Sequence, residues 1–179
     1  GVADPALLPV YAEALAMLGS DSAMVVAGDE PLDELSVAGG SSIVTVPLSP
    51  NPVCAEPVEA PPFLPPVAED KDSPSTSSGR TGLRGILRIT PETAGLPRHA
   101  PEALRGGDAA YNAAALRRLL LSAQDTPQDR AYRDAVLLNS AAALMVAGHA
   151  SDWQSSVEEA AEAIDKGLAN ALLNCWVKF

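Results

Sequence analysis

The sequence has few aromatic residues, few cysteines and few basic residues, and each shortage excludes a class of protein. Aromatic side chains make up only 4% of the 179 residues, so the core must be built from Ala, Leu and Val. The two cysteines, Cys54 and Cys175, form no CxxC pair and no metal-ligand pattern, which excludes a disulfide scaffold and favours a reducing cytoplasm. A net charge of −11 argues against a surface for nucleic acid or an anionic membrane, because it would repel phosphate groups.

Long apolar runs are also missing. The most apolar stretch, residues 135–147, is interrupted by Asn139 and Ser140 and is shorter than the roughly 20 residues that cross a bilayer. No basic segment followed by an apolar one marks a signal peptide. With 47% apolar residues, the chain is long enough for one soluble globular domain with a real core.

The pattern of apolar residues predicts an α/β domain. Short β-branched runs predict strands, and apolar residues at helical spacing predict helices. Asp4-Pro5 is a good start for the first helix, Pro9 is an alternative start, and Gly19 is its expected stop. Ser151 and Gln154 have the spacing of a capping box for the last predicted helix. The predicted strands are 23–27, 42–46 and 85–90. Besides the first helix, the predicted helical segments are 108–122, 129–148 and 151–167.

The composition changes abruptly in residues 47–85. This segment holds nine of the 16 prolines, and Ser and Thr crowd its second half. Proline removes backbone donors, so neither a helix nor a sheet is expected there. We predict a disordered insertion at the tip of a β-hairpin formed by 42–46 and 86–90, where an insertion is best tolerated. A polyproline segment that docks on an SH3-like partner is the alternative.

Four acidic residues lie between the first two predicted strands. Asp33 and Glu34 are adjacent, and in a loop two such side chains can converge on one cation. Mg²⁺ is usually held by one or two carboxylates, with waters and substrate phosphates completing its shell. The alternative is that they are solvated loop acids, as we expect for Asp29 and Glu30. The four residues do not have the spacing of an EF-hand.

Several motifs, taken together, point to one family. They run in order along residues 1–46 and 86–179, and they resemble the C-terminal half of the anthranilate phosphoribosyltransferases. The most specific are LDELS at 32–36, GGDA at 106–109, Asn112-Ala113 and DAVLLN at 134–139.

The resemblance implies the C-terminal part of the α/β domain found in phosphoribosyltransferases and nucleoside phosphorylases, with packed C-terminal helices. Residues 1–179 would be a portion of one catalytic domain, and the family's N-terminal helical domain, through which its members form homodimers, would be absent. The family transfers the 5-phosphoribosyl group from phosphoribosyl pyrophosphate to anthranilate, in tryptophan biosynthesis. The resemblance also implies that Asp33 and Glu34 are Mg²⁺ ligands. Its catalytic and substrate-binding residues are expected upstream of Gly1, so none is assigned here and the chain alone is expected to be inactive.

The sequence departs from the family pattern at two positions beside the acids. Ala27 stands where many relatives have His, and Pro31 stands where Gly is common. A non-catalytic or nucleic-acid-binding homologue, or a nucleoside phosphorylase, remains an alternative on the same fold. Acidity argues against nucleic acid, because 18 acidic and 9 basic residues remain without residues 47–85.

Three polar features receive structural interpretations. Gly106-Gly107-Asp108 is interpreted as a turn and a helix cap rather than an anion site. Asn139 and Ser140, inside an apolar helix, are expected to be satisfied internally against a loop. His99 is interpreted as a loop residue without a catalytic role.

Overall fold

A computed structural model describes residues 1–46 and 85–178, and its centre is a three-stranded antiparallel sheet. The strands are β1 (Ala23–Gly28), β2 (Ser41–Val46) and β3 (Leu87–Ile89), in the order β1-β2-β3. All three predicted strands are confirmed. The register pairs Val25 with Val44 and Ser42 with Arg88, so β2 and β3 form the predicted hairpin. The predicted insertion at its tip lies outside the described residues, apart from Gly85.

β1 and β2 are covered on both faces, which explains their apolar runs, whereas β3 at the edge is largely exposed. Successive side chains of a strand point to opposite faces. Val25 and Val44 therefore pack with the N-terminal helix, whereas Val26 and Ile43 pack with the C-terminal helices. The two faces belong to two separate clusters of buried side chains, and the larger cluster lies on the C-terminal side.

The N-terminal helix begins in two steps. Asp4 accepts a hydrogen bond from the Ala6 amide at 2.9 Å and caps a short 3-10 turn, η1 (Pro5–Leu7). The regular helix α1 (Leu8–Met17) follows directly. Both proposed starts therefore contribute, because each proline falls in a first turn, where its missing N–H costs nothing.

The C-terminal half is helical, as predicted. Two 3-10 turns, η2 (Pro91–Ala94) and η3 (Pro101–Leu104), lead into four α-helices. One prediction is wrong: the cap of α4 is Asp152, which accepts from the Ser155 amide at 2.9 Å, and not Ser151. Asp152 has the extended backbone that a cap requires, and its short carboxylate reaches the first turn. The helices are α2 (Ala109–Leu120), α3 (Pro127–Val146), α4 (Trp153–Asp165) and α5 (Leu168–Trp176).

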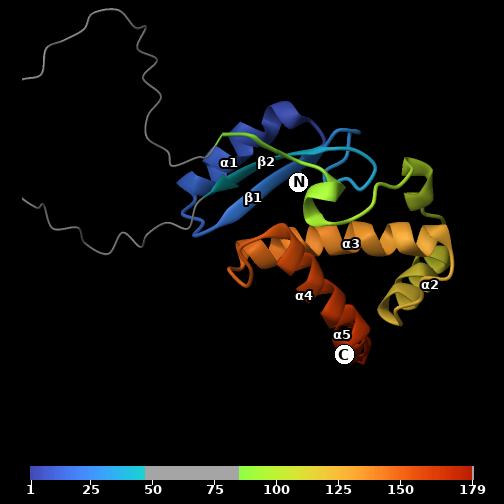
Figure 1. The fold of residues 1–179 in the computed structure, drawn as a ribbon. Helices are drawn as coiled ribbons and strands as arrows, with labels where there is room; N and C mark the ends of the chain where they lie inside the picture. Colours follow the sequence, from blue (N-terminus) through green and yellow to red (C-terminus); the bar gives the residue numbers. More distant parts are fainter. Residues whose placement is uncertain (47–84, 179) are drawn as a thin grey trace, which may run out of the picture.

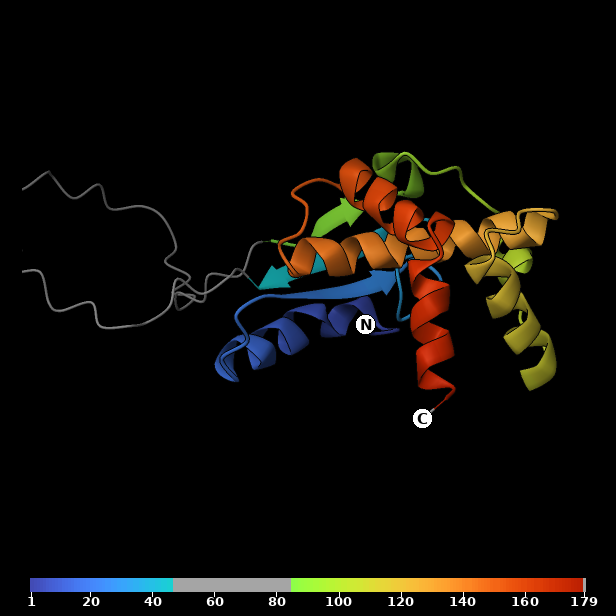
Figure 2. The ribbon, with the colours of Figure 1, turned by 90° about the horizontal axis from the view of Figure 1, so that it is seen from below.

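The elements form layers, with α1 on one side of the sheet and α3 on the other (Figure 1). α2 and the α4–α5 pair extend from α3 away from the sheet, and Figure 2 shows α2 and α5 projecting in the same direction. α3 is therefore central, as predicted, because it contacts both the sheet side and the outer helices. None of the described helices has the length and apolar character needed to cross a membrane.

The first residues of the chain lie along the outer edge of β1. The Val2 amide donates to the Val26 carbonyl at 2.9 Å, and the Val2 side chain is buried in the cluster beneath α1. Gly1 consequently contacts the backbone carbonyl of Asp33, where no larger side chain would fit. The first two residues therefore pack beside the acidic loop, residues 29–40, which connects β1 to β2.

Candidate functional site

The candidate site is the loop of residues 29–40, which connects β1 to β2. A β-bridge between Gly28 and Leu32 closes its first turn, with the Gly28 amide donating to the Leu32 carbonyl at 2.9 Å. A Cβ at Gly28 would lie only 3.2 Å from the Glu34 carbonyl oxygen, so glycine permits the loop to fold back over the strand. The loop is therefore a compact, hydrogen-bonded structure.

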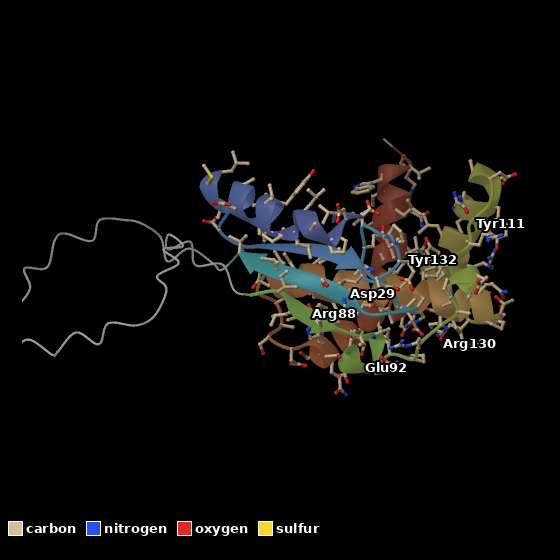
Figure 3. The ribbon with its side chains drawn as sticks, turned by 90° about the horizontal axis from the view of Figure 1, so that it is seen from above. Asp29, Arg88, Glu92, Tyr111, Arg130 and Tyr132 are labelled. Carbon is tan, nitrogen blue, oxygen red and sulfur yellow. The ribbon has the colours of Figure 1, made fainter. Side chains whose placement is uncertain are left out.

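Asp29 is part of the scaffold of this loop, which corrects its interpretation as a solvated acid. Its two oxygens accept from the Arg88 guanidinium at 2.6 and 2.7 Å, and Oδ2 also accepts from the Gly40 amide at 3.0 Å. The hydrogen bond from Arg88 is the main reason why the pKa of Asp29 lies below its usual value of 3.8. Figure 3 shows the two side chains meeting across the sheet end. Sequence alone missed this pair because 59 residues separate its members.

Glu30 also has a structural partner, so its interpretation as a solvated acid is wrong too. Its Oε2 accepts from the Ser36 hydroxyl at 2.8 Å, and the same hydroxyl oxygen accepts from the Ala38 and Gly39 amides at 3.0 Å. Ser36 is only 2% exposed. Glu30 therefore completes a buried polar cluster that shapes the second half of the loop.

Asp33 and Glu34 differ from these two acids. Both side chains are exposed, and within residues 1–46 and 85–178 no hydrogen bond or ion pair engages either carboxylate. They lie between two buried or bridged neighbours, Leu32 and Leu35, so their backbone is held while their side chains face solvent.

The two carboxylates of Asp33 and Glu34 fit Mg²⁺ better than a cation that takes all its ligands from the protein. The described part of the chain contains no cluster of three or more His, Cys, Asp or Glu side chains that could enclose a metal. Two unengaged carboxylates are, however, what a protein usually offers to Mg²⁺, which keeps several waters and binds substrate phosphates. Asp33 and Glu34 can hold such an ion only together with ligands from outside the loop.

α3 anchors the loop directly behind the pair. The Asn139 amide exchanges two hydrogen bonds with the backbone of Leu35: Oδ1 accepts from its N–H at 2.9 Å and Nδ2 donates to its C=O at 3.0 Å. This confirms the expectation that Asn139 is satisfied against a loop. The signal was a polar residue in the middle of an apolar helix. The same expectation is wrong for Ser140, because no hydrogen bond engages its side chain within the described residues.

A second anchor was missed. His99 Nε2 lies 2.6 Å from Asp134 Oδ2 in a largely buried pair, and the His99 amide donates to the Val37 carbonyl at 2.9 Å. The pair thereby links α3 to the loop through the segment before η3. The His99–Asp134 pairing has no signal in the sequence, because histidine in a loop and aspartate on a helix are both ordinary.

The sequence comparisons place the chain in a family. Residues 75–170, more than half of the chain, match the profile described as glycosyl transferase family, a/b domain. The chain belongs to this family. The acidic loop lies outside this matched segment, but it falls within the region aligned with curated relatives.

Two curated relatives are similar over nearly the whole chain. Anthranilate phosphoribosyltransferase of Novosphingobium aromaticivorans is 48% identical over 99% of this chain, and that of Sphingopyxis alaskensis is 47% identical over all of it. In each case the match covers 42% of the relative. The chain thus spans about two fifths of the length of these relatives.

Solved structures support the same fold. Anthranilate phosphoribosyltransferase from Thermus thermophilus matches 99% of this chain and 41% of its own, with 29% identity and a TM-score of 0.69. A structure of the Saccharomyces cerevisiae protein of that name, in complex with PRPP and Mg, covers 97% of this chain and 40% of its own, with 20% identity and a TM-score of 0.71. The predicted fold class, part of an α/β domain of this type, is therefore confirmed.

The other glycine-rich motif of the chain is structural, as interpreted from its sequence. Asp108 caps α2 by accepting from the Tyr111 amide at 2.8 Å, and the Asn112 side chain closes the turn onto Gly107 at 2.9 and 3.0 Å. Tyr111 and Tyr132 line a hollow of about 240 Å³ between η3, α2 and α3 (Figure 3). This hollow lies away from the acidic loop, and Asp108 uses its carboxylate on its own helix.

Proposed function

We propose that the complete protein carrying this chain transfers the 5-phosphoribosyl group from phosphoribosyl pyrophosphate to anthranilate. By complete protein we mean this chain together with the region that corresponds to the remaining three fifths of its relatives. Relatives that bear the name of this activity and share nearly half of the residues support the proposal. The LDELS stretch that carries the acidic pair lies within the aligned region.

We further propose that Asp33 and Glu34 hold Mg²⁺ against the pyrophosphate of the donor. The supporting observation is their contrast with Asp29 and Glu30, whose carboxylates are occupied by Arg88 and Ser36. A bound Mg²⁺ would offset the negative charge that develops on the departing pyrophosphate. The chain's own part is to keep two carboxylates adjacent in the loop after β1, with no partner among the described residues.

Calorimetric titration tests this assignment. The complete protein is titrated with phosphoribosyl pyrophosphate at several Mg²⁺ concentrations, for the wild type and for Asp33→Asn and Glu34→Gln. Loss of one charged ligand should weaken Mg²⁺-dependent binding by roughly a hundredfold, equivalent to about 3 kcal/mol. Binding measured without a divalent cation should hardly change, because these substitutions keep size and shape.

Matched controls are available at the opposite end of the sheet. Glu13 on α1 and Asp21 in the turn before β1 are exposed acids of the same types. Glu13→Gln and Asp21→Asn change the net charge equally, so they should leave Mg²⁺-dependent binding at the wild-type value. Equal weakening by all four substitutions would mean that general charge, and not this pair, attracts the cation.

Two broader expectations follow from the same resemblance. We infer that the complete protein is a cytoplasmic homodimer that associates through a helical domain outside this chain. Light scattering on the purified complete protein measures its mass in solution. A monomer that is active at assay concentration would contradict the dimer.

A further inference from the structure

We infer that Asn139 is a positioning residue for the Asp33–Glu34 pair. The inference rests on the proposed function, because it concerns the cation assigned to that pair. It starts from one contact: a single side-chain amide on α3 pairs with both the N–H and the C=O of Leu35, which lies 104 positions away in the sequence.

A third hydrogen bond defines how the amide is oriented. Asn139 Nδ2 also donates to the Ala135 carbonyl, one turn earlier on α3, at 3.0 Å. An inverted amide would place its NH₂ group against the Leu35 N–H and its oxygen against two carbonyls. Only the observed orientation satisfies all three backbone groups, so the amide acts as a rigid link between helix and loop.

This link fixes the backbone on which the two carboxylates stand. Leu35 directly follows Glu34, and both of its peptide planes are held by Asn139. Its side chain is 2% exposed, in the core cluster beneath α3. On the other side, the Leu32 carbonyl is held by the Gly28 amide at 2.9 Å. Only Asp33 and Glu34 lie between these two fixed points.

A pair of ligands held in this way needs little further ordering when a cation binds. Partners behind metal ligands commonly change metal affinity by roughly 10- to 100-fold when they are removed. Asn139 stands behind the pair in this sense, since it contacts the loop and not the carboxylates. Its removal should therefore loosen residues 33–35 and weaken cation binding while both ligands remain present.

The test uses Asn139→Ala and Asn139→Leu in the complete protein. The leucine variant keeps the number and branching of the side-chain heavy atoms, removes every hydrogen-bonding group and adds no charge that could itself attract a cation. Ser140→Ala is the control, because Ser140 is the next residue on α3 and no hydrogen bond engages its side chain within the described residues. Three quantities are measured: exchange of the Leu35 amide, Mg²⁺ half-saturation with phosphoribosyl pyrophosphate, and the KM for anthranilate.

Both Asn139 variants should exchange the Leu35 amide faster than the wild type, and their Mg²⁺ half-saturation should rise about tenfold. Excess Mg²⁺ should restore most of the turnover, and the KM for anthranilate should stay near the wild-type value. Ser140→Ala should change none of these quantities. Such a pattern separates positioning from stability, because a merely structural role would lower all activities together with the folded fraction.

Two results overturn the inference, and they are distinguishable. If Asp33→Asn and Glu34→Gln weaken Mg²⁺-dependent binding but the Asn139 variants do not, the pair binds the cation and Asn139 does not position it. If none of these substitutions changes Mg²⁺ dependence, the metal assignment itself fails, and faster exchange at Leu35 marks Asn139 as a structural residue only.

Discussion

Two acidic pairs lie four residues apart in the loop between β1 and β2, and their carboxylates have opposite surroundings. Asp29 and Glu30 are occupied by Arg88, Gly40 and Ser36, whereas Asp33 and Glu34 face solvent. A charge that is already paired holds the loop together. A charge held in place without a partner remains available for a ligand, which is why the second pair is the better candidate site.

The two acidic pairs should differ most in their effect on turnover, which is the largest effect that we expect. In the complete protein, Asp33→Ala and Glu34→Ala should each lower kcat by roughly a hundredfold, about 3 kcal/mol of transition-state stabilisation. Asp29→Ala and Glu30→Ala should lower activity only as far as they lower the folded fraction. Steady-state kinetics over a Mg²⁺ series, normalised to folded protein, measures the difference. Equal losses at all four positions would mean that the two pairs do not differ in their role.

The next largest effect is on the unfolding free energy, through the partners of Asp29 and Glu30. Ser36→Ala removes the hydroxyl that donates to Glu30 and accepts from two loop amides. Leaving these groups unpaired in a site that is 2% exposed should cost about 1–3 kcal/mol of unfolding free energy. Glu30→Gln is the control, because its amide oxygen still accepts from the hydroxyl. Denaturant unfolding measures both, and an equal loss in both variants would show that the charge of Glu30 matters more than the amides.

The ion pair of Asp29 should contribute less, because both side chains are about half exposed. Asp29→Asn keeps an acceptor for the Gly40 amide and loses the charge, so it should cost up to about 1 kcal/mol at neutral pH. The folded-state pKa of Asp29 lies below 3.8, so its contribution is present above that value and is lost as the pH falls through the folded-state pKa. Unfolding measured from pH 7 to pH 2 should therefore show the wild type and the variant converging at low pH. A gap that persists at pH 2 would contradict the ion pair as its cause.

The smallest effect is expected for the second pair when stability alone is measured. Asp33→Asn and Glu34→Gln should change the unfolding free energy by less than about 0.5 kcal/mol, because both side chains are exposed and neither has a partner within residues 1–46 and 85–178. Thermal unfolding of the complete protein without divalent cations provides the value. A larger loss would mean that these acids support the fold, as Asp29 does.

Much of the fold follows from local pattern. Short β-branched runs gave strands, and proline and aspartate marked the start of α1 because their preferences act over a few residues. There are two exceptions: α5 was not among the predicted helices, and the cap of α4 moved by one residue, from Ser151 to Asp152. Such choices depend on which side chain reaches the first turn, which the spacing of the sequence does not resolve.

Local sequence pattern was enough to predict most of the helices and strands, the adjacency of Asp33 and Glu34 and the resemblance that points to Mg²⁺. Which of the four acids have partners among the described residues depends on how the chain packs in three dimensions. The partners of Asp29, Leu35 and His99 lie 59, 104 and 35 positions away, so they meet only when the sheet and α3 pack together. Local sequence preferences cannot predict these long-range contacts, because the free energy that brings the residues together comes from burying the two faces of the sheet.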